Sequence, residues 1–421
     1  NTAVGKEALS ANTTGADNTA VGAYALDITT TGNYNTALGT RALESATTAS
    51  YNVAVGTYAL SAASTGDQNV AVGYAAMDSV TTGAGNIGIG QNAAGANTTG
   101  AGNVAIGQNV FDANTTGANN VAIGRDSMSA NTTANNNTAV GYASLMGNTT
   151  GYSNVAVGKG ALEANTTAYN NVAVGMNAAD AITTGYSNTA IGYNAMGAMT
   201  TGGDNVAIGD GCFATANSAS ATQNTFIGRG CASAAVANTG NVAMGYNAYS
   251  SGTGGINNTS IGRQAGDVIT TGGNNLSIGY LADPSGATAS NEVTLGNSSI
   301  SSIRCQVQTI SSLSDARDKQ NIEELPLGVE FINTLRPVKF DWAMRDGANK
   351  GVQEVGFLAQ ELDKAQQDAD AEEYMRLVLK SNPDKLESTY GKLVPILTKA
   401  VQELSAEVED LKKKAHDKCS N

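Results

Sequence analysis

The chain has 421 residues, of which 50 are Gly, 5% are aromatic and 14% are charged, so few large side chains are available for a conventional globular core. The net charge of -13 is spread thinly without a basic patch, which excludes the charge pattern of a nucleic-acid-binding protein. No run of eighteen apolar residues exists, so we expect no membrane insertion.

A repeat of 17 residues runs through most of the chain. Asn occupies its first position from Asn1 to Asn275, and Gly occupies its fifth position from Gly5 to Gly296. The repeats begin at residues 1, 18, 35, 52, 69, 86, 103, 120, 137, 154, 171, 188 and 205 and, after a two-residue insertion, at 224, 241, 258, 275 and 292. This self-similarity indicates a solenoid. Because the chain has neither signal peptide nor initiator Met and starts inside the repeat, we expect further protein upstream of Asn1.

Each repeat contains a segment such as NVAVG, whose alternation predicts a short strand. The fourth position is aliphatic, while the third is mostly Ala, so the opposite face offers only Ala and Gly and would let a neighbouring chain approach closely. A second strand around the ninth position and two turns would complete each coil, and stacked coils would pair like residues. Cys212 and Cys231 share the eighth position and are expected to stack as buried free thiols.

Several features of the array imitate binding sites. The glycines around Gly88 and Gly90 follow the repeat period rather than a phosphate-loop pattern, and the NTT triplets recur where each coil must turn. Stacked Thr13 and Thr14 and their equivalents predict threonine ladders, but adjacent residues point opposite ways, which disfavours an ice-binding face. The array lacks the regular aspartates of calcium-binding repeats, and the four cysteines lack zinc-site spacing. We therefore expect no metal and no cofactor.

The pattern NTAVG…AL…NTTG resembles the head repeats of trimeric autotransporter adhesins, which are also found in phage tail fibres. The resemblance covers residues 1–296. It implies a mainly β fold, a left-handed parallel β-roll solenoid of 17-residue coils with three rolls packed side by side.

The repeat stops at Gly296, and a Ser-rich linker, residues 297–313, leads into a different domain, residues 314–421. There the charge rises and the only Trp appears, which predicts a small α+β domain. GVEFINTL predicts a helix, PVKFDW a strand, and VGFLAQELDKAQQ a strand followed by a helix. Apolar residues with four-three spacing over residues 390–415 predict a C-terminal coiled coil, with Pro395 near its first turn.

This domain resembles the C-terminal intramolecular chaperone of phage tail spikes and fibres, the self-cleaving endosialidase type. The matching segments are SDARDKQNI, LRPVKFDW, GFLAQEL and the closing LTKAVQEL. The resemblance implies a homotrimer, folding of the preceding β-structured fibre, and cleavage between Leu313 and Ser314. It places the catalytic serine-lysine pair at Ser314 and Lys319, where Asp315 and Arg317 are expected to support it.

The residues themselves are consistent with this chemistry. The only histidine, His416, lies in the terminal tail, so a serine nucleophile must be activated by another group, and a Ser-Lys pair is one such arrangement. The lysine has to lose its charge, which burial between chains or a neighbouring cation such as Arg317 would favour. We expect a loop between Ser314 and Lys319, because five residues of α-helix would point the two side chains apart.

The combined interpretation is the distal part of a phage tail fibre, assembled in the host cytoplasm and located on the virion. Such a fibre would bind a host cell-surface receptor, a glycan or an outer-surface protein. Any enzymatic activity would be single-turnover self-cleavage, without turnover of an external substrate. The alternatives are a bacterial trimeric surface adhesin, which would need a membrane barrel, and a polysaccharide-degrading tail spike, which would need clustered carboxylates.

Overall fold

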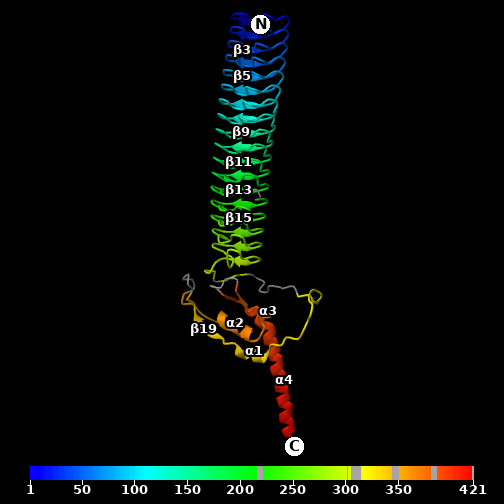
Figure 1. The fold of residues 1–421 in the computed structure, drawn as a ribbon, viewed down its shortest axis with the longest axis vertical. Helices are drawn as coiled ribbons and strands as arrows, with labels where there is room; N and C mark the ends of the chain where they lie inside the picture. Colours follow the sequence, from blue (N-terminus) through cyan, green and yellow to red (C-terminus); the bar gives the residue numbers. More distant parts are fainter. Residues whose placement is uncertain (216–220, 301, 305–313, 344–349, 381–385, 420–421) are drawn as a thin grey trace. The chain divides into compact units, whose positions relative to one another are not determined.

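A computed structural model of the chain describes residues 1–215, 221–300, 302–304, 314–343, 350–380 and 386–419. The chain divides into two compact units, Asn1–Gly296 and Asn297–Asn421. The first is a parallel β-solenoid, and the second combines short strands with a long C-terminal helix (Figure 1). The predicted solenoid of 17-residue coils is therefore confirmed, whereas its left-handedness and its assembly into trimers stay predictions.

Each coil of the solenoid contributes one three-residue strand from its second to fourth positions. Successive strands pair in parallel and in register, so that Ala105 lies opposite Ala122. The two-residue insertion leaves this register intact, because Val206 still pairs with Thr225. The strands are β1 (Thr2–Val4), β2 (Thr19–Val21), β3 (Thr36–Leu38), β4 (Val53–Val55), β5 (Val70–Val72), β6 (Ile87–Ile89), β7 (Val104–Ile106), β8 (Val121–Ile123), β9 (Thr138–Val140), β10 (Val155–Val157), β11 (Val172–Val174), β12 (Thr189–Ile191), β13 (Val206–Ile208), β14 (Thr225–Ile227), β15 (Val242–Met244), β16 (Thr259–Ile261), β17 (Leu276–Ile278) and β18 (Val293–Leu295).

The strand faces point opposite to the sequence-based expectation. The third-position alanines, such as Ala105 and Ala122, are fully buried inside their own coils. The Val, Ile, Leu or Thr residues at the second position and the aliphatic residues at the fourth point outward and keep part of their surface exposed, for example 59% for Val4 and 48% for Leu38. We call these second- and fourth-position side chains the outer strip. The assignment of the Ala face to neighbouring chains was wrong, because in a coil this thin the interior beside a large ninth-position side chain leaves room only for a small side chain on the strand.

The remainder of each coil is built from turns, so the expected second strand is absent from the described coils (Figure 1). Buried ninth-position leucines such as Leu26 and Leu60 adopt left-handed backbone angles, with φ of 53° and 52°. A β-strand cannot include such residues. Their N–H groups still bond to the next coil, as Leu26 N donates to Ala42 O at 3.1 Å.

A column of buried asparagines at the first position ties the coils together. Asn120 Oδ1 accepts the backbone N–H of Asn137 at 3.0 Å, and Asn120 Nδ2 donates to the carbonyl oxygen of Ala134 at 2.9 Å. The same amide nitrogen reaches Asn103 Oδ1 at 3.1 Å. The pattern recurs from coil to coil, which explains why no other residue type occupies this position in the full repeats: the site needs a donor and an acceptor on one short side chain.

The fifth-position glycines form a second column of close contacts within the chain. Gly107 has φ of 141°, and a Cβ atom there would lie 2.8 Å from the carbonyl carbon and oxygen of Gly124 in the next coil. The glycines are thus required by stacking of the coils in one chain. This contact gives no support to the expectation that the glycines let neighbouring chains approach.

In most coils a large side chain fills much of the interior, and its position can change. In the coil that starts at Asn224, Phe226 takes the third position while the ninth is Ala232, so the large and small residues have exchanged places. Phe226 packs against Phe213 of the preceding coil, with ring centroids 5.0 Å apart. Cys212 and Cys231 are buried and free, as expected for neighbours in the eighth-position column.

The second unit contains the predicted elements near PVKFDW and VGFLAQELDKAQQ. Its elements are the 3₁₀ turn η1 (Ala316–Asp318), α1 (Val329–Thr334), β19 (Val338–Asp341), β20 (Gln353–Gly356), α2 (Ala359–Asp368), α3 (Glu372–Met375), β21 (Val378–Leu379), β22 (Glu387–Ser388), the 3₁₀ turn η2 (Tyr390–Lys392) and α4 (Leu393–Cys419). β19 and β20 are antiparallel. A small core joins α1, α2 and the start of α4 through Phe331, Leu362 and Ile396.

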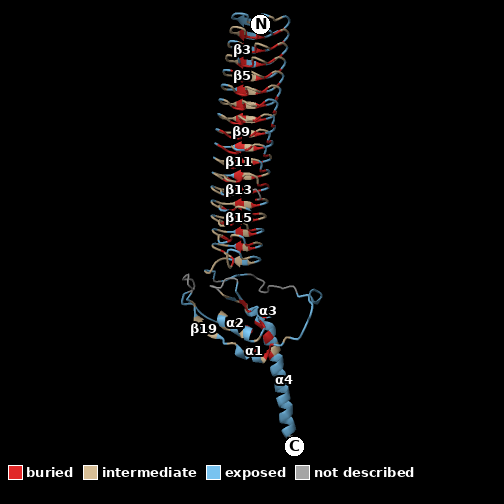
Figure 2. Ribbon diagram, in the orientation of Figure 1, coloured by how far each residue is buried: buried red, intermediate tan, exposed pale blue. Residues whose placement is uncertain are grey.

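Helix α4 is attached to this unit by its first turns only. Figure 2 shows buried residues near its start, whereas the described remainder is exposed. Glu403 Oε2 accepts the N–H of Val329 at 2.8 Å and thereby caps α1. The predicted seam begins later than expected, because Tyr390 lies in η2 and bonds to the backbone of Phe357. Among the described residues, no helix combines the length and apolar character needed to cross a membrane.

Candidate functional site

The segment from Ser314 to Lys319 folds into a single 3₁₀ turn, η1. Asp315 precedes the turn in an extended conformation, and its Oδ1 accepts the N–H of Arg317 at 2.9 Å. Asp318 N and Lys319 N donate to the carbonyl oxygens of Asp315 and Ala316, each at 3.2 Å. An Asp at this position is a favoured cap because it satisfies an N–H group that the turn itself leaves free.

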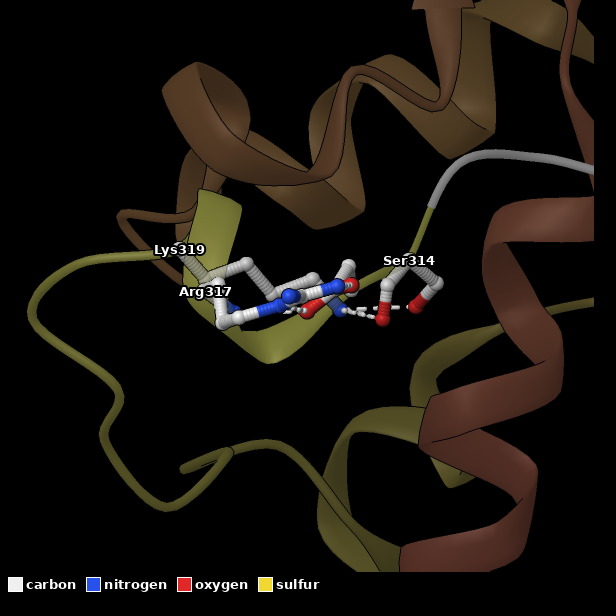
Figure 3. Close-up of polar contacts among 4 residues, drawn as sticks. Ser314, Arg317 and Lys319 are labelled. Carbon is white, nitrogen blue, oxygen red and sulfur yellow. Dashed lines mark hydrogen bonds and ion pairs between the residues drawn. The ribbon is translucent and has the colours of Figure 1, made fainter.

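The turn brings Lys319 back to Ser314. Lys319 Nζ lies 2.7 Å from Ser314 Oγ and 3.4 Å from the carbonyl oxygen of Ser314 (Figure 3). The first distance is within the range in which a general base can take a proton from a hydroxyl. The ammonium donates in this contact, and after loss of one proton the same nitrogen could accept. The segment is therefore a compact turn rather than an open loop, yet it meets the expectation that the two side chains do not diverge.

Arg317 is held by Asp315. Its Nη2 lies 2.6 Å from Asp315 Oδ2, and its Nε lies 3.1 Å from both carboxylate oxygens. The hydrogen bonds from the Arg317 side chain and then from its N–H lower the pKa of Asp315, while the bond to Asp315 raises the pKa of Arg317. The guanidinium is thus paired with Asp315 in this structure, and its expected role as a cation that favours neutral Lys319 stays a prediction.

The described residues of this segment are exposed to solvent. Ser314, Arg317 and Lys319 all have open surface in the single chain, and no ion pair joins residues 314–319 to another described element. Leu313, the other residue of the expected cleavage site, lies outside the described residues. The described geometry of the expected site is therefore limited to the contact between Ser314 and Lys319.

The array features that imitate binding sites have structural partners. Thr13 Oγ1 donates to Thr30 O, and Thr98 Oγ1 donates to Thr115 O, each at 2.9 Å, so these threonine hydroxyls link one coil to the next. Within the described part of the chain, no group of three or more His, Cys, Asp or Glu side chains lies close enough to hold a metal ion. The threonine hydroxyls are therefore explained by their part in stacking the coils.

The fold and the site together define a β-solenoid followed by a small domain that opens with a serine-lysine contact. Residues 314–371 match the protein family described as the chaperone of endosialidase. The match starts at Ser314 and includes the whole turn, but it covers less than half of the chain. No curated protein matches the chain.

Two features of these units were missed by sequence reasoning. The capping role of Asp315 had a signal, because an Asp side chain at the start of a turn commonly bonds to the backbone N–H two residues further on. The contact between Glu403 and Val329 had none, since the two residues are 74 positions apart and no spacing in the sequence relates them.

Proposed function

We propose that this chain is the distal part of a phage tail fibre, whose C-terminal unit directs folding and is then released by self-cleavage before Ser314. The observation that carries the proposal is the 2.7 Å contact between Ser314 Oγ and Lys319 Nζ at the first residues of the endosialidase-chaperone match. The long repeat array that precedes this site supports a fibre as the product that the chaperone leaves behind.

The cleavage would run as an acyl shift followed by hydrolysis. Neutral Lys319 takes the proton of the Ser314 hydroxyl, and Oγ attacks the carbonyl carbon of Leu313. The bond from that carbon to the Ser314 nitrogen breaks, the nitrogen receives the proton, and an ester joins Leu313 to Ser314 Oγ. Water then hydrolyses the ester, which leaves a carboxylate on Leu313 and a free amine and hydroxyl on Ser314.

Denaturing gels of the full chain test this proposal. The wild-type protein should split into a long fragment and one of about a hundred residues, whose first residue is Ser314 by mass spectrometry. Ser314→Ala and Lys319→Ala should remain intact while keeping the circular dichroism spectrum of the wild type. Equal cleavage of Ser314→Ala would assign the cut to a host protease and end the proposal.

We further propose that three chains assemble along the outer strip and along α4. Parallel sheets are normally covered on both faces, yet the outer strip leaves aliphatic side chains in contact with solvent along the whole array. A partner that covers the outer strip must present an apolar surface of the same length and period. A second copy of the chain has such a surface. The four-three apolar seam of α4 is also exposed in a single chain, at Val394, Leu397, Val401, Leu404, Val408 and Leu411.

The mass of the uncleaved Ser314→Ala protein tests this assembly. Light scattering should give three times the chain mass of 42.5 kDa. Adding Val121→Asp and Ile123→Asp to the outer strip should give monomers with an intact solenoid, because a charge buried between chains is strongly unfavourable. Thr116→Asp, at an exposed turn position, is the matched control and should remain trimeric. A trimer that survives both strip substitutions would refute the interface.

Receptor binding is the least constrained part of the proposal, because a glycan or an outer-surface protein would serve equally. Adsorption of the purified, cleaved fibre to host cells, with and without removal of surface glycan, separates these two receptors. Incubation with the same glycan then separates binding from hydrolysis. Shortening of the glycan chains would favour a polysaccharide-degrading tail spike, and unchanged chains would favour a binding fibre.

A further inference from the structure

Two charged residues, Asp315 and Arg317, lie beside the Ser314–Lys319 contact. A carboxylate attracts a lysine ammonium more strongly than a neutral hydroxyl does. Asp315 is the residue next to Ser314, so its carboxylate competes with Ser314 Oγ for Lys319. The observed arrangement nevertheless has Lys319 on Ser314, at 2.7 Å. Something must therefore remove Asp315 from the competition.

Arg317 contacts both oxygens of the Asp315 carboxylate and thereby removes it from the competition for Lys319. Oδ1 accepts the N–H of Arg317 at 2.9 Å and its Nε at 3.1 Å, while Oδ2 accepts Nη2 at 2.6 Å and Nε at 3.1 Å. Both oxygens thus have partners from one residue. A planar guanidinium binds a carboxylate through several parallel contacts, which a single ammonium cannot replace.

We infer that Asp315 and Arg317 are positioning residues for self-cleavage, because Asp315 caps the turn and Arg317 keeps the Asp315 carboxylate from capturing Lys319. The inference rests on the proposed cleavage before Ser314. Neither residue touches the reacting atoms. Their effect is exerted through the place and the charge state of Lys319 Nζ.

The proposed roles of Asp315 and Arg317 predict different effects of Arg317→Ala and Asp315→Asn on the cleavage rate. Arg317→Ala frees the carboxylate, so Lys319 should pair with Asp315 and stay charged. Asp315→Asn keeps an oxygen that caps the turn but lacks the charge that would hold Lys319. If sequestration is the mechanism, Asp315→Asn should therefore rescue Arg317→Ala. If both residues only stabilise the turn, the double variant should be no faster than Arg317→Ala.

The charged groups within the segment are Asp315, Arg317, Asp318 and Lys319, and no ion pair joins them to another described element. Asp318 is unchanged in every variant. The pH dependence then has a defined sign. Arg317→Ala should move the acid limb of the cleavage-rate profile to higher pH, because a paired ammonium gives up its proton less readily. The double variant should return that limb towards the wild-type position.

The experiment is a time course of cleavage of the full chain, refolded from denaturant and followed on gels at several pH values. Arg317→Ala should be slower than the wild type by on the order of 100-fold near neutral pH, the lower end of what a general base contributes. Asp315→Asn alone should stay within about threefold of the wild type, since Asn and Asp cap equally well. The double variant should recover at least about tenfold over Arg317→Ala.

Controls separate this inference from the cleavage proposal itself. Circular dichroism of each uncleaved sample reports whether the unit has folded, and Arg317→Lys tests whether a cation without the guanidinium fork is sufficient. Absence of cleavage in the wild type, or cleavage of Ser314→Ala, would overturn the proposed function. Normal cleavage of Arg317→Ala, or a folded double variant that is no faster than Arg317→Ala, would overturn the positioning roles while leaving Ser314 and Lys319 in place.

Discussion

The buried asparagine column offers the sharpest test of how the solenoid is stabilised. Asn120→Ala removes the acceptor for the N–H of Asn137 and the 2.9 Å donor to Ala134 O. Both groups lie in residues that are at most 3% exposed, so water cannot replace the lost partners, and Ala134 O keeps only a long contact with Asn131 Nδ2 at 3.5 Å. Each orphaned buried group costs about 1–3 kcal/mol, which gives a destabilisation of about 2–6 kcal/mol for one side chain.

Urea unfolding of the full chain, followed by circular dichroism, measures the loss. The matched control is Thr116→Ala, which truncates an exposed turn residue in the preceding coil and should change stability by less than about 0.5 kcal/mol. Hydrogen exchange should rise first around β7 to β9, because each coil depends on its immediate neighbours. Equal unfolding midpoints for the two variants would show that the asparagine column is not a principal support of the array.

Three further outcomes follow from other groups in the solenoid. Gly107→Ala should destabilise the single chain by at least about 2 kcal/mol in urea unfolding, because its φ of 141° and its contact with the next coil leave no room for Cβ. Burial and the charge of Asp267 raise the pKa of Asp283 to about 6. The folded chain therefore takes up a proton that the unfolded chain, with a value of about 3.9, does not, and stability should rise from about pH 7 to about pH 4.5 in the wild type but not in Asp283→Asn. The Cys231 thiol and burial raise the pKa of Cys212, so iodoacetamide should modify neither cysteine until the chain is unfolded, as peptide mass mapping would show.

The periodicity of the sequence was sufficient to predict the coil length and the strand positions, because stacking forces like residues into register. It was not sufficient to orient the strand. A three-residue strand with an aliphatic residue on one side and Ala on the other suits either a large interior or a small one. The deciding quantity is the width of the coil, which depends on left-handed residues such as Leu26 and Leu60. Those leucines gave no signal, since left-handed backbone is normally left to Gly or Asn.

The candidate site, too, could be predicted from the sequence only in part. Spacing and family resemblance predicted that Ser314 and Lys319 would approach each other, and their side chains lie in hydrogen-bond contact. The partner of Arg317 could not be predicted, because an exposed arginine among Asp315, Asp318 and Lys319 has several local alternatives. Only the conformation of the turn decides that Asp315 receives it.

The exchange of large and small residues at Phe226 and Ala232 within one coil has a consequence for how the length of this array can evolve. The coil that starts at Asn224 offsets its large Phe226 with the small Ala232, and it presents the same Asn and Gly to the coils on either side. Loss or duplication of one whole 17-residue unit therefore brings together two coils that still fit. Recombination between near-identical gene segments would then lengthen or shorten the solenoid in steps of about 4.8 Å while the Asn and Gly columns stay continuous.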